Sequence, residues 1–357
     1  MHAEIDRIVR ELPCLGVQER IDERLALDDA GFAVALARAV ATAHGGDHHL
    51  VAQCLRAILA RPVSGKVAAA LEVVAVMRPP KARARHIATW LAGSLKHDEA
   101  VDAFGAAGVA GPIADELRAC LLHELVVRGV VIAEHDQLMQ WASSPHWAWH
   151  PLRVLPLERM PLEHVRPSHT VGSGALPSTT SSAPLRIPAA IETTTSLRAG
   201  QLRQAVANWQ RESNGRSEAR AFTLDHLPAP DAVTALLGTL ALECLRSDHG
   251  ATADLTVDES TPADIWSILF AAAAAGGAYN TGEGAAYGRL YAWRSLGALC
   301  GASEFDAVDH IARLAADARW FAFAATTAWF ERVAWDIGIA ALTPEPGVTV
   351  LAATDTD

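Results

Sequence analysis

Lysine is scarce in this chain of 357 residues, which holds only Lys66, Lys81 and Lys96. Arginine supplies nearly all the positive charge, and the formal net charge is −11. A strongly acidic chain has poor affinity for phosphate backbones and anionic lipid headgroups. We therefore expect neither a nucleic acid nor a membrane as a partner.

Cysteine is also sparse and shows no paired spacing. The five cysteines are widely separated and include no CxxC pair: Cys14, Cys54, Cys120, Cys244 and Cys300. This distribution is typical of free buried thiols in a reducing compartment. The charged start of the chain lacks the apolar core of a signal peptide, and the longest nearly apolar run, 265–278, is too short to span a bilayer. These features predict a cytoplasmic protein.

The common catalytic motifs are missing. The sequence has no GK[ST], no G-x-S-x-G and no HExxH, and no cysteine has a basic neighbour that would activate it. His44, Asp47, His48 and His49 cluster at an expected helix–helix turn, where surface and capping roles are more typical than metal binding. We expect no metal and no other cofactor, and whether the chain is an enzyme stays open.

The first part of the chain has the apolar periodicity of helices. From residue 3 to about 142, apolar residues recur at spacings of three and four between glycine and proline breakers. The clearest predicted helices are 31–43, 49–60, 67–77, 85–95 and 113–131. Short helices in close succession indicate either an irregular array of the HEAT or armadillo kind or a compact bundle. We assign residues 1–165 to this helical domain.

A change of composition follows the predicted helical domain. Residues 167–196 are rich in Ser, Thr, Pro and Gly, which cannot bury much surface. The sequence therefore predicts a linker over 166–200, and a second domain over 201–357.

The second domain mixes helical and strand patterns. Thr261 before Pro262 is a good helix start, and helices are expected over 231–245, 262–275, 285–299 and 304–318. Alternating apolar residues on both sides of a Pro-Glu-Pro-Gly turn predict a hairpin over 333–353, with further strands at 221–224 and 319–323. The acidic run from Asp254 to Asp264 is interpreted as a loop and a helix cap. The predicted fold is thus mainly α, with a C-terminal α+β region that holds a small antiparallel sheet.

The most unusual segment is 276–296, which holds all three tyrosines and a glycine-rich turn before a helix. A helical period of 3.6 residues places Glu283, Tyr287 and Arg294 on one stripe, whereas Arg289 and Trp293 point elsewhere. Such a stripe can hold a polar ligand, or it can clamp two structural elements together. The candidate binding residues are Tyr279, Asn280, Glu283, Tyr287, Arg289, Arg294 and Asp336.

If the segment is a packing element, its aromatic helix needs a partner surface. We expect the helix to pack on the hairpin at 333–353. We also expect Arg289 or Arg294 to pair with Asp336 or Glu283, because arginine bridges elements well through its forked guanidinium.

Two stretches resemble a known family. These stretches resemble a family of bacterial proteins known only as a domain of unknown function. The first contains the segments Ala278-Tyr279-Asn280, Gly288-Arg289-Leu290 and Trp293-Arg294-Ser295, and the second is the C-terminal segment from Trp335 onward. The resemblance covers mainly residues 276–357. It implies that the two stretches belong to one fold unit, and it implies no activity, cofactor or catalytic residue.

Three functions stay open. The first is an interaction or scaffold protein that binds another protein through a helical surface. The second is an enzyme or small-ligand binder with a pocket near Gly282–Arg294 and Asp336. A third, an immunity- or toxin-associated module, is suggested only by the acidic C-terminal half. Four side chains can distinguish the ligand-binding function from the interaction function: Glu283, Tyr287, Arg294 and Asp336. Their convergence on an open cavity would favour a ligand binder, and their burial in mutual pairs would favour an interaction protein. The sequence leaves the oligomeric state open.

Overall fold

The computed structural model describes residues 1–12, 16–77, 81–105, 114–164, 186–246, 254–330 and 335–355. The chain forms two compact units, Met1–Arg153 and Val154–Asp357. Within the described ranges, no helix combines the length and apolar composition needed to cross a membrane.

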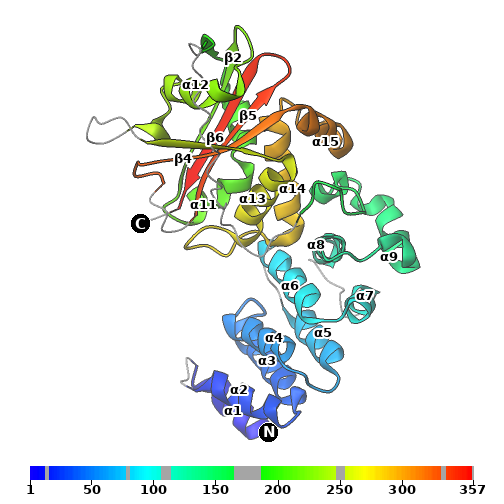
Figure 1. Ribbon diagram of the computed structural model, residues 1–357. Coiled ribbons are helices and arrows are strands. Elements are labelled where there is room, and N and C mark those ends of the chain that lie inside the picture. Colours follow the sequence, from blue (N-terminus) through cyan, green and yellow to red (C-terminus); the bar gives the residue numbers. More distant parts are fainter. Residues whose placement is uncertain are drawn as a thin grey trace. The chain divides into compact units, whose positions relative to one another are not determined.

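The first unit is built of helices, as the periodicity predicts (Figure 1). The described residues of Met1–Arg153 contain no strand. Its α-helices are α1 (His2–Arg10), α2 (Val17–Ala26), α3 (Ala30–His44), α4 (His49–Ala60), α5 (Lys66–Val76), α6 (Lys81–Ser94), α7 (His97–Gly105), α8 (Ala114–Val127) and α9 (Asp136–Ser143). Short 3-10 helices follow at η2 (Ile132–Glu134), η3 (Pro145–Trp147) and η4 (Pro151–Val154), the last of which ends at the first residue of the second unit.

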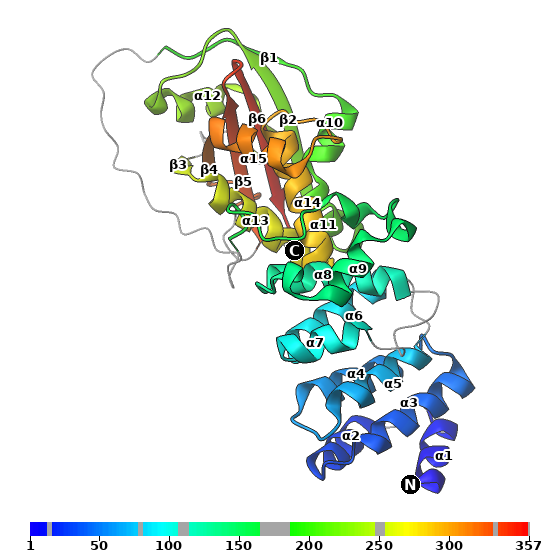
Figure 2. The ribbon, with the colours of Figure 1, turned by 90° about the vertical axis from the view of Figure 1, so that its right-hand side faces the viewer.

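Neighbours in sequence are neighbours in space in this unit. The main contacts join each helix to those one or two places along the chain, such as α1 with α3, α3 with α5 and α6 with α8. Figure 2 shows the helices following one another from α1 to α9. This pattern is that of a helical array, because a compact bundle would also join the first helices to the last.

The second unit is α+β. Its helices are α10 (Ser196–Leu202), η5 (Gln204–Val206), α11 (Ala207–Glu212), η6 (Pro230–Ala232), α12 (Val233–Thr239), η7 (Glu243–Leu245), α13 (Pro262–Ala275), α14 (Gly284–Leu299) and α15 (Val308–Asp317). Its strands are β1 (Ala190–Glu192), β2 (Arg216–Leu224), β3 (Leu255–Ser260), β4 (Arg319–Ala325), β5 (Asp336–Thr343) and β6 (Gly347–Thr354).

The strands form one antiparallel sheet in the order β1-β2-β6-β5-β4-β3. The predicted hairpin is confirmed as β5 and β6, which pair from Asp336 with Thr354 to Thr343 with Gly347. The predicted strands at 221–224 and 319–323 are confirmed within β2 and β4. Residues 333 and 334 of the predicted hairpin lie outside the described residues.

Three local predictions were wrong. The acidic stretch before Asp264 forms the edge strand β3, because Leu255 and Val257 pack against the sheet's core. Within the predicted linker over 166–200, strand β1 pairs with β2 and α10 begins at Ser196. The predicted helix 231–245 is broken into η6, α12 and η7, with Ala241 in the left-handed region at φ 50°.

Both faces of the sheet are covered. One face and α12 enclose an apolar cluster that includes Phe222, Leu236, Phe323, Leu342 and Val350. The other face carries buried residues such as Ile339, Leu351 and Trp320, and α13, α14 and α15 belong to this side, where Trp320 Nε1 donates to Ala315 O at 2.7 Å. The sheet thus supports α13 and α14, which pack on each other and hold the segment 276–296 between and within them.

The division between the units falls at 153/154, earlier than the predicted domain end at 165. The boundary is earlier because the residues up to Glu163 belong to the second unit, where the Glu163 side chain is buried against α14. Residues 166–185 of the predicted linker lie outside the described residues.

Candidate functional site

The turn between α13 and α14 folds back tightly on the end of α13. Gly276 has φ +85° and Gly282 has φ +65°, which side chains rarely adopt. A Cβ on Gly282 would lie 2.4 Å from Ala274 O. The Glu283 N–H donates to Ala273 O at 2.9 Å. The predicted glycine-rich turn is therefore confirmed, and its glycines serve close packing of the two helices.

Asn280 organises this turn from within. Its Oδ1 accepts hydrogen bonds from the backbone N–H groups of Gly277 at 3.1 Å and Gly282 at 3.2 Å. The same oxygen accepts from Nδ2 of Asn208, on α11, at 3.3 Å. Tyr279, beside it, is 61% exposed and points to the outside of the unit.

Glu283 connects the start of α14 to α11. It is 7% exposed and forms an ion pair with Arg211. Arg211 also donates to Glu212 Oε1 at 2.8 Å. The bonds to Glu212 and then Glu283 raise the pKa of Arg211 against the opposite effect of burial. The carboxylate of Glu283 is also well placed for the dipole at the start of α14.

The end of the chain closes the same junction. Asp355 is fully buried, and its carboxylate accepts from the Ser213 hydroxyl at 2.6 Å and from Ala278 N at 2.7 Å. A Cβ on Gly277 would lie 1.9 Å from Asp355 Oδ2. One residue earlier, Thr354 donates from its hydroxyl to Asp336 Oδ1 at 3.0 Å. We call Asn208, Arg211, Ser213, Asn280, Glu283 and Asp355 the loop junction.

The opposite stripe of α14 holds a second polar cluster. Arg289 Nε donates to Glu163 Oε1 at 2.7 Å, and Trp293 Nε1 donates to the same oxygen at 2.6 Å. The other guanidinium nitrogens donate to Pro156 O at 2.7 Å and Glu158 O at 2.6 Å. These contacts fasten the segment 156–163 onto α14.

A family model matches residues 15–357. The chain belongs to DUF6183, a family of unknown function. The DUF6183 match covers parts of both units, and it confirms the resemblance to a domain of unknown function that was seen in 276–357. The chain matches no curated protein and no solved structure.

The predicted arginine pairing in this DUF6183 chain was wrong in its partner. Among the described residues, Arg289 forms its ion pair with Glu163, Glu283 forms one with Arg211, and Asp336 Oδ1 accepts from the Thr354 hydroxyl. The reason is geometric, since Arg289 points away from the stripe of Glu283. Arg294 contacts Gln204 Oε1 at 3.4 Å.

The candidate residues thus divide among separate contacts. Asn280 and Glu283 meet in the loop junction, and Tyr287 is buried with its ring 5.8 Å from that of Tyr291. Sequence reasoning missed five partners: Glu163, Asn208, Arg211, Ser213 and Asp355. Only Asp355 had a signal, since it lies in the C-terminal stretch that carries the resemblance.

Other polar clusters in the described residues are also packed. Burial and the nearby Glu116 raise the pKa of the Cys120 thiol well above its usual value, and Glu116 contacts His150 Nε2 at 3.1 Å. His48 caps α4, with Nδ1 accepting from Leu50 N at 3.3 Å. Among the described residues, no group of three or more metal-binding side chains is placed to hold an ion.

Proposed function

We propose that this chain is an interaction protein that binds another protein through the helical surface of Met1–Arg153. The observation that carries the proposal is an open groove along α1, α3 and the start of α5, with a volume of about 590 Å³. It is lined by His2, Ile5, Asp6, Ala30, Gly31, Val34, Ala35, Arg38, Ala39, Ser64, Gly65, Ala68, Ala69 and Glu72.

The lining of this groove suits a helix of another protein. Gly31, Ala35 and Ala39 recur along α3 at a spacing of four, so they share one face of the helix. Small side chains on such a face let another backbone approach closely, and apolar contact then supplies the binding energy. Arg38 and Glu72 form an ion pair at 2.7 Å across the groove, and both stay exposed enough to meet a polar rim. We call this the α1–α3–α5 groove.

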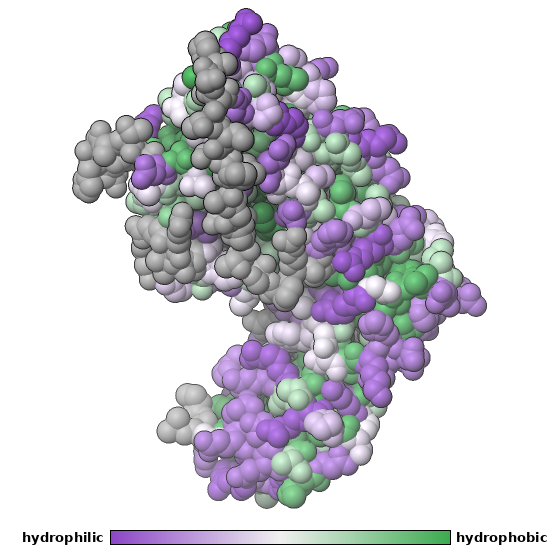
Figure 3. Space-filling view, in the orientation of Figure 1, coloured by the Kyte–Doolittle hydropathy of each residue, from purple (hydrophilic) through white to green (hydrophobic). Residues whose placement is uncertain are grey.

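The surroundings of this groove fit a transient partner. The face of this region seen in Figure 3 is mostly hydrophilic, with small hydrophobic areas between. A limited apolar surface with a polar rim is typical of proteins that exchange partners. The burial of Glu283, Tyr287 and Arg289 in packing contacts supports the same proposal, because these side chains were the main candidates for a ligand pocket.

A pair of matched variants tests the proposal. Ala68 lies exposed in the groove, and Ala26 lies exposed at the end of α2 outside it. Tagged full-length chains carrying Ala68→Arg or Ala26→Arg are used to capture proteins from cells that express the chain. We expect a protein that the unmodified chain and Ala26→Arg retain and that Ala68→Arg loses. Its binding is then repeated with purified components, and equal binding to all three chains would refute this groove as the interface.

The second candidate function, an enzyme or small-ligand binder near Gly282–Arg294 and Asp336, has one supporting observation. The buried Nδ2 of Asn280 has no hydrogen-bond partner among the described residues, and exposed Tyr279 is next to it. Asn280→Asp keeps the Oδ1 acceptor but removes this donor. Loss of a small-molecule thermal shift in that variant, with unchanged unfolding of the free protein, would favour this candidate.

A further inference from the structure

A second groove lies on the helical unit, between α2 and α4. Its volume is about 590 Å³, and it is lined by Gln18, Asp22, Gln53, Arg56, Ala57, Ala60, Arg61 and Pro62. Gln53, Arg56, Ala57 and Ala60 follow the three-and-four spacing of one helix face. The lining differs from that of the α1–α3–α5 groove, because amides and guanidinium groups stand beside a small apolar floor. We call this the α2–α4 groove.

The one carboxylate in this lining is already engaged. Asp22 Oδ1 contacts Arg61 at 3.2 Å, and Asp22 Oδ2 accepts from Gln18 Nε2 at 3.3 Å. The charges of Asp22 and Arg61 therefore largely offset each other. The remaining cation in the lining is Arg56.

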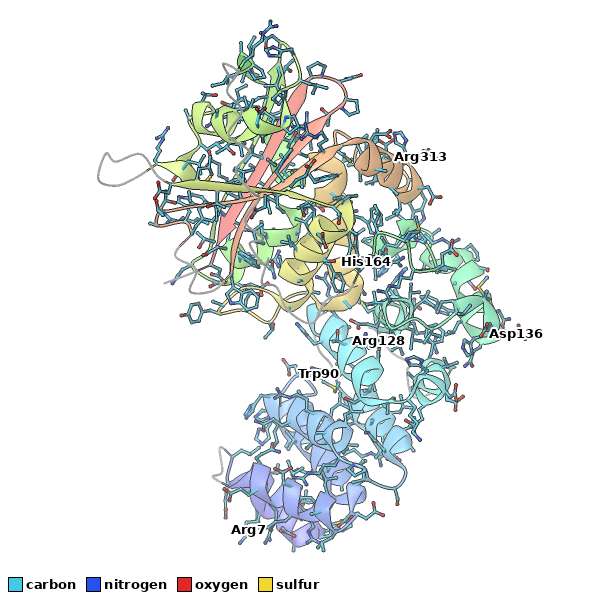
Figure 4. All side chains as sticks on the ribbon, in the orientation of Figure 1. Arg7, Trp90, Arg128, Asp136, His164 and Arg313 are labelled. Atoms are coloured by element: carbon cyan, nitrogen blue, oxygen red, sulfur yellow. The ribbon has the colours of Figure 1, made fainter. Side chains whose placement is uncertain are left out.

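Arg56 is oriented but not paired with an acid. Its guanidinium carbon lies 5.4 Å from the ring centre of Trp90, on α6, which Figure 4 labels. Within the described ranges, no carboxylate lies at ion-pair distance from Arg56. A position over an aromatic face restricts a guanidinium while leaving its forked N–H groups available in the plane of the guanidinium. A fork held in this way matches the two oxygens of a carboxylate.

We propose that the α2–α4 groove binds an acidic segment of a partner protein, whose carboxylate is held by Arg56. Gln53 lies one turn before Arg56 and carries both a donor and an acceptor, which a peptide group can satisfy. Ala57 and Ala60 leave room for the peptide backbone. This inference rests on the proposed role as an interaction protein, but it concerns a different groove.

The net charge of the chain makes this recognition testable. At −11, the protein as a whole repels an acidic peptide, so any binding depends on a local site. The probe is a fluorescein-labelled hexaglutamate peptide, followed by fluorescence anisotropy with the full-length chain at low salt. Hexaglutamine is the uncharged comparison, because it has nearly the same shape without the carboxylates.

The variants distinguish binding by the forked guanidinium of Arg56 from nonspecific attraction by positive charge. We expect Arg56→Gln to weaken hexaglutamate binding at least about ten-fold, as expected for a charge-assisted pair. The affinity of Arg56→Lys for hexaglutamate should lie between that of the unmodified chain and that of Arg56→Gln, because an ammonium is a point charge without the forked N–H groups. Arg7→Gln removes the same charge from an exposed position on α1, and it should leave binding unchanged (Figure 4).

Four results of the peptide measurements would overturn the proposal. They are the absence of hexaglutamate binding, equal binding of hexaglutamine, equal weakening by Arg7→Gln, and no weakening by Arg56→Gln. Free glutarate distinguishes the source of the carboxylate: competition by glutarate at the same concentration as the peptide would show a small dicarboxylate site instead. None of these results depends on the α1–α3–α5 groove, so failure here is distinguishable from failure of the proposed function.

Discussion

Arg289 and Glu163 form a buried ion pair, with Nε and Oε1 separated by 2.7 Å. Both side chains are nearly inaccessible to solvent, at 0% and 1% exposure. Trp293 Nε1 donates to the same Glu163 oxygen, and Met160 N donates to Glu163 Oε2 at 3.2 Å. Two backbone carbonyls accept from the other guanidinium nitrogens. A buried pair of this kind depends on both partners, because a single charge left behind has no water to solvate it.

We therefore expect Glu163→Gln and Arg289→Ala each to lower the free energy of unfolding by about 3–5 kcal/mol. Urea denaturation of the full-length chain measures this loss. Arg313→Ala, at an exposed position of α15, is the control and should change little (Figure 4). Losses no larger than that of the control would mean that the pair is not needed for the fold.

A second prediction concerns Gly277 and Asp355. A methyl group on Gly277 would meet the Asp355 carboxylate at 1.9 Å, so Gly277→Ala should cost about 1–3 kcal/mol of stability. The clash disappears when the carboxylate is removed. In the background Asp355→Ala, the same glycine substitution should therefore cost much less. Thermal unfolding of the four chains gives this coupling, and strictly additive effects would contradict the contact.

Elements whose determining residues are close together in the sequence were predictable, whereas contacts between distant residues were not. The hairpin β5–β6 was predictable, since Ile337 and Ile339 alternate before a proline and glycine turn and the pairing is local. The start of α13 was predictable too, because Thr261 accepts from Asp264 N at 3.1 Å as an N-cap should. In each case the residues that determine the element lie within it.

The partners of the candidate site were not predictable in this way. Glu163 is 126 residues from Arg289, and Asp355 is 77 residues from Ala278. No periodicity links such positions, and the identity of the partner depends on how α13 and α14 pack on the sheet. Strand β3 was missed for a related reason, because its acidic residues concealed two apolar positions whose partner strand β4 follows much later in the chain.

A third prediction concerns the thiols. Burial raises the pKa of Cys54 to about 12 and that of Cys300 to about 11. Cys120 and Cys244 are also buried, and desolvation raises their pKa as well. Since the thiolate is the reactive form, iodoacetamide at about pH 8 should label these four cysteines slowly in the native protein and rapidly in urea. Peptide mass spectrometry assigns the sites, and rapid native labelling of any of the four would contradict its burial.

The last prediction concerns His48 at the start of α4. Its Nδ1 accepts from Leu50 N, so the ring must be unprotonated at this nitrogen to cap the helix. Its ring centre lies 4.4 Å from that of His49 and 5.5 Å from that of His44. Burial, then His49 and His44, lower the pKa of His48 below its ordinary value of 6.5, against the opposing effect of Asp47.

The sign of the pH dependence follows from this lowered pKa. As pH falls below 6.5, the unfolded chain binds a proton at His48 before the folded chain does, so the folded state loses stability. Above that pH the contribution of His48 is fully present. His48→Asn keeps a capping side chain that does not titrate. The free energy of unfolding of this variant should therefore fall less between about pH 7.5 and 5.5 than that of the unmodified chain. Urea denaturation at both pH values measures the difference, with His97→Asn, an exposed histidine at the start of α7, as the matched control. If His48→Asn and His97→Asn give the same pH dependence as the unmodified chain, the capping histidine does not control the acid sensitivity of α4.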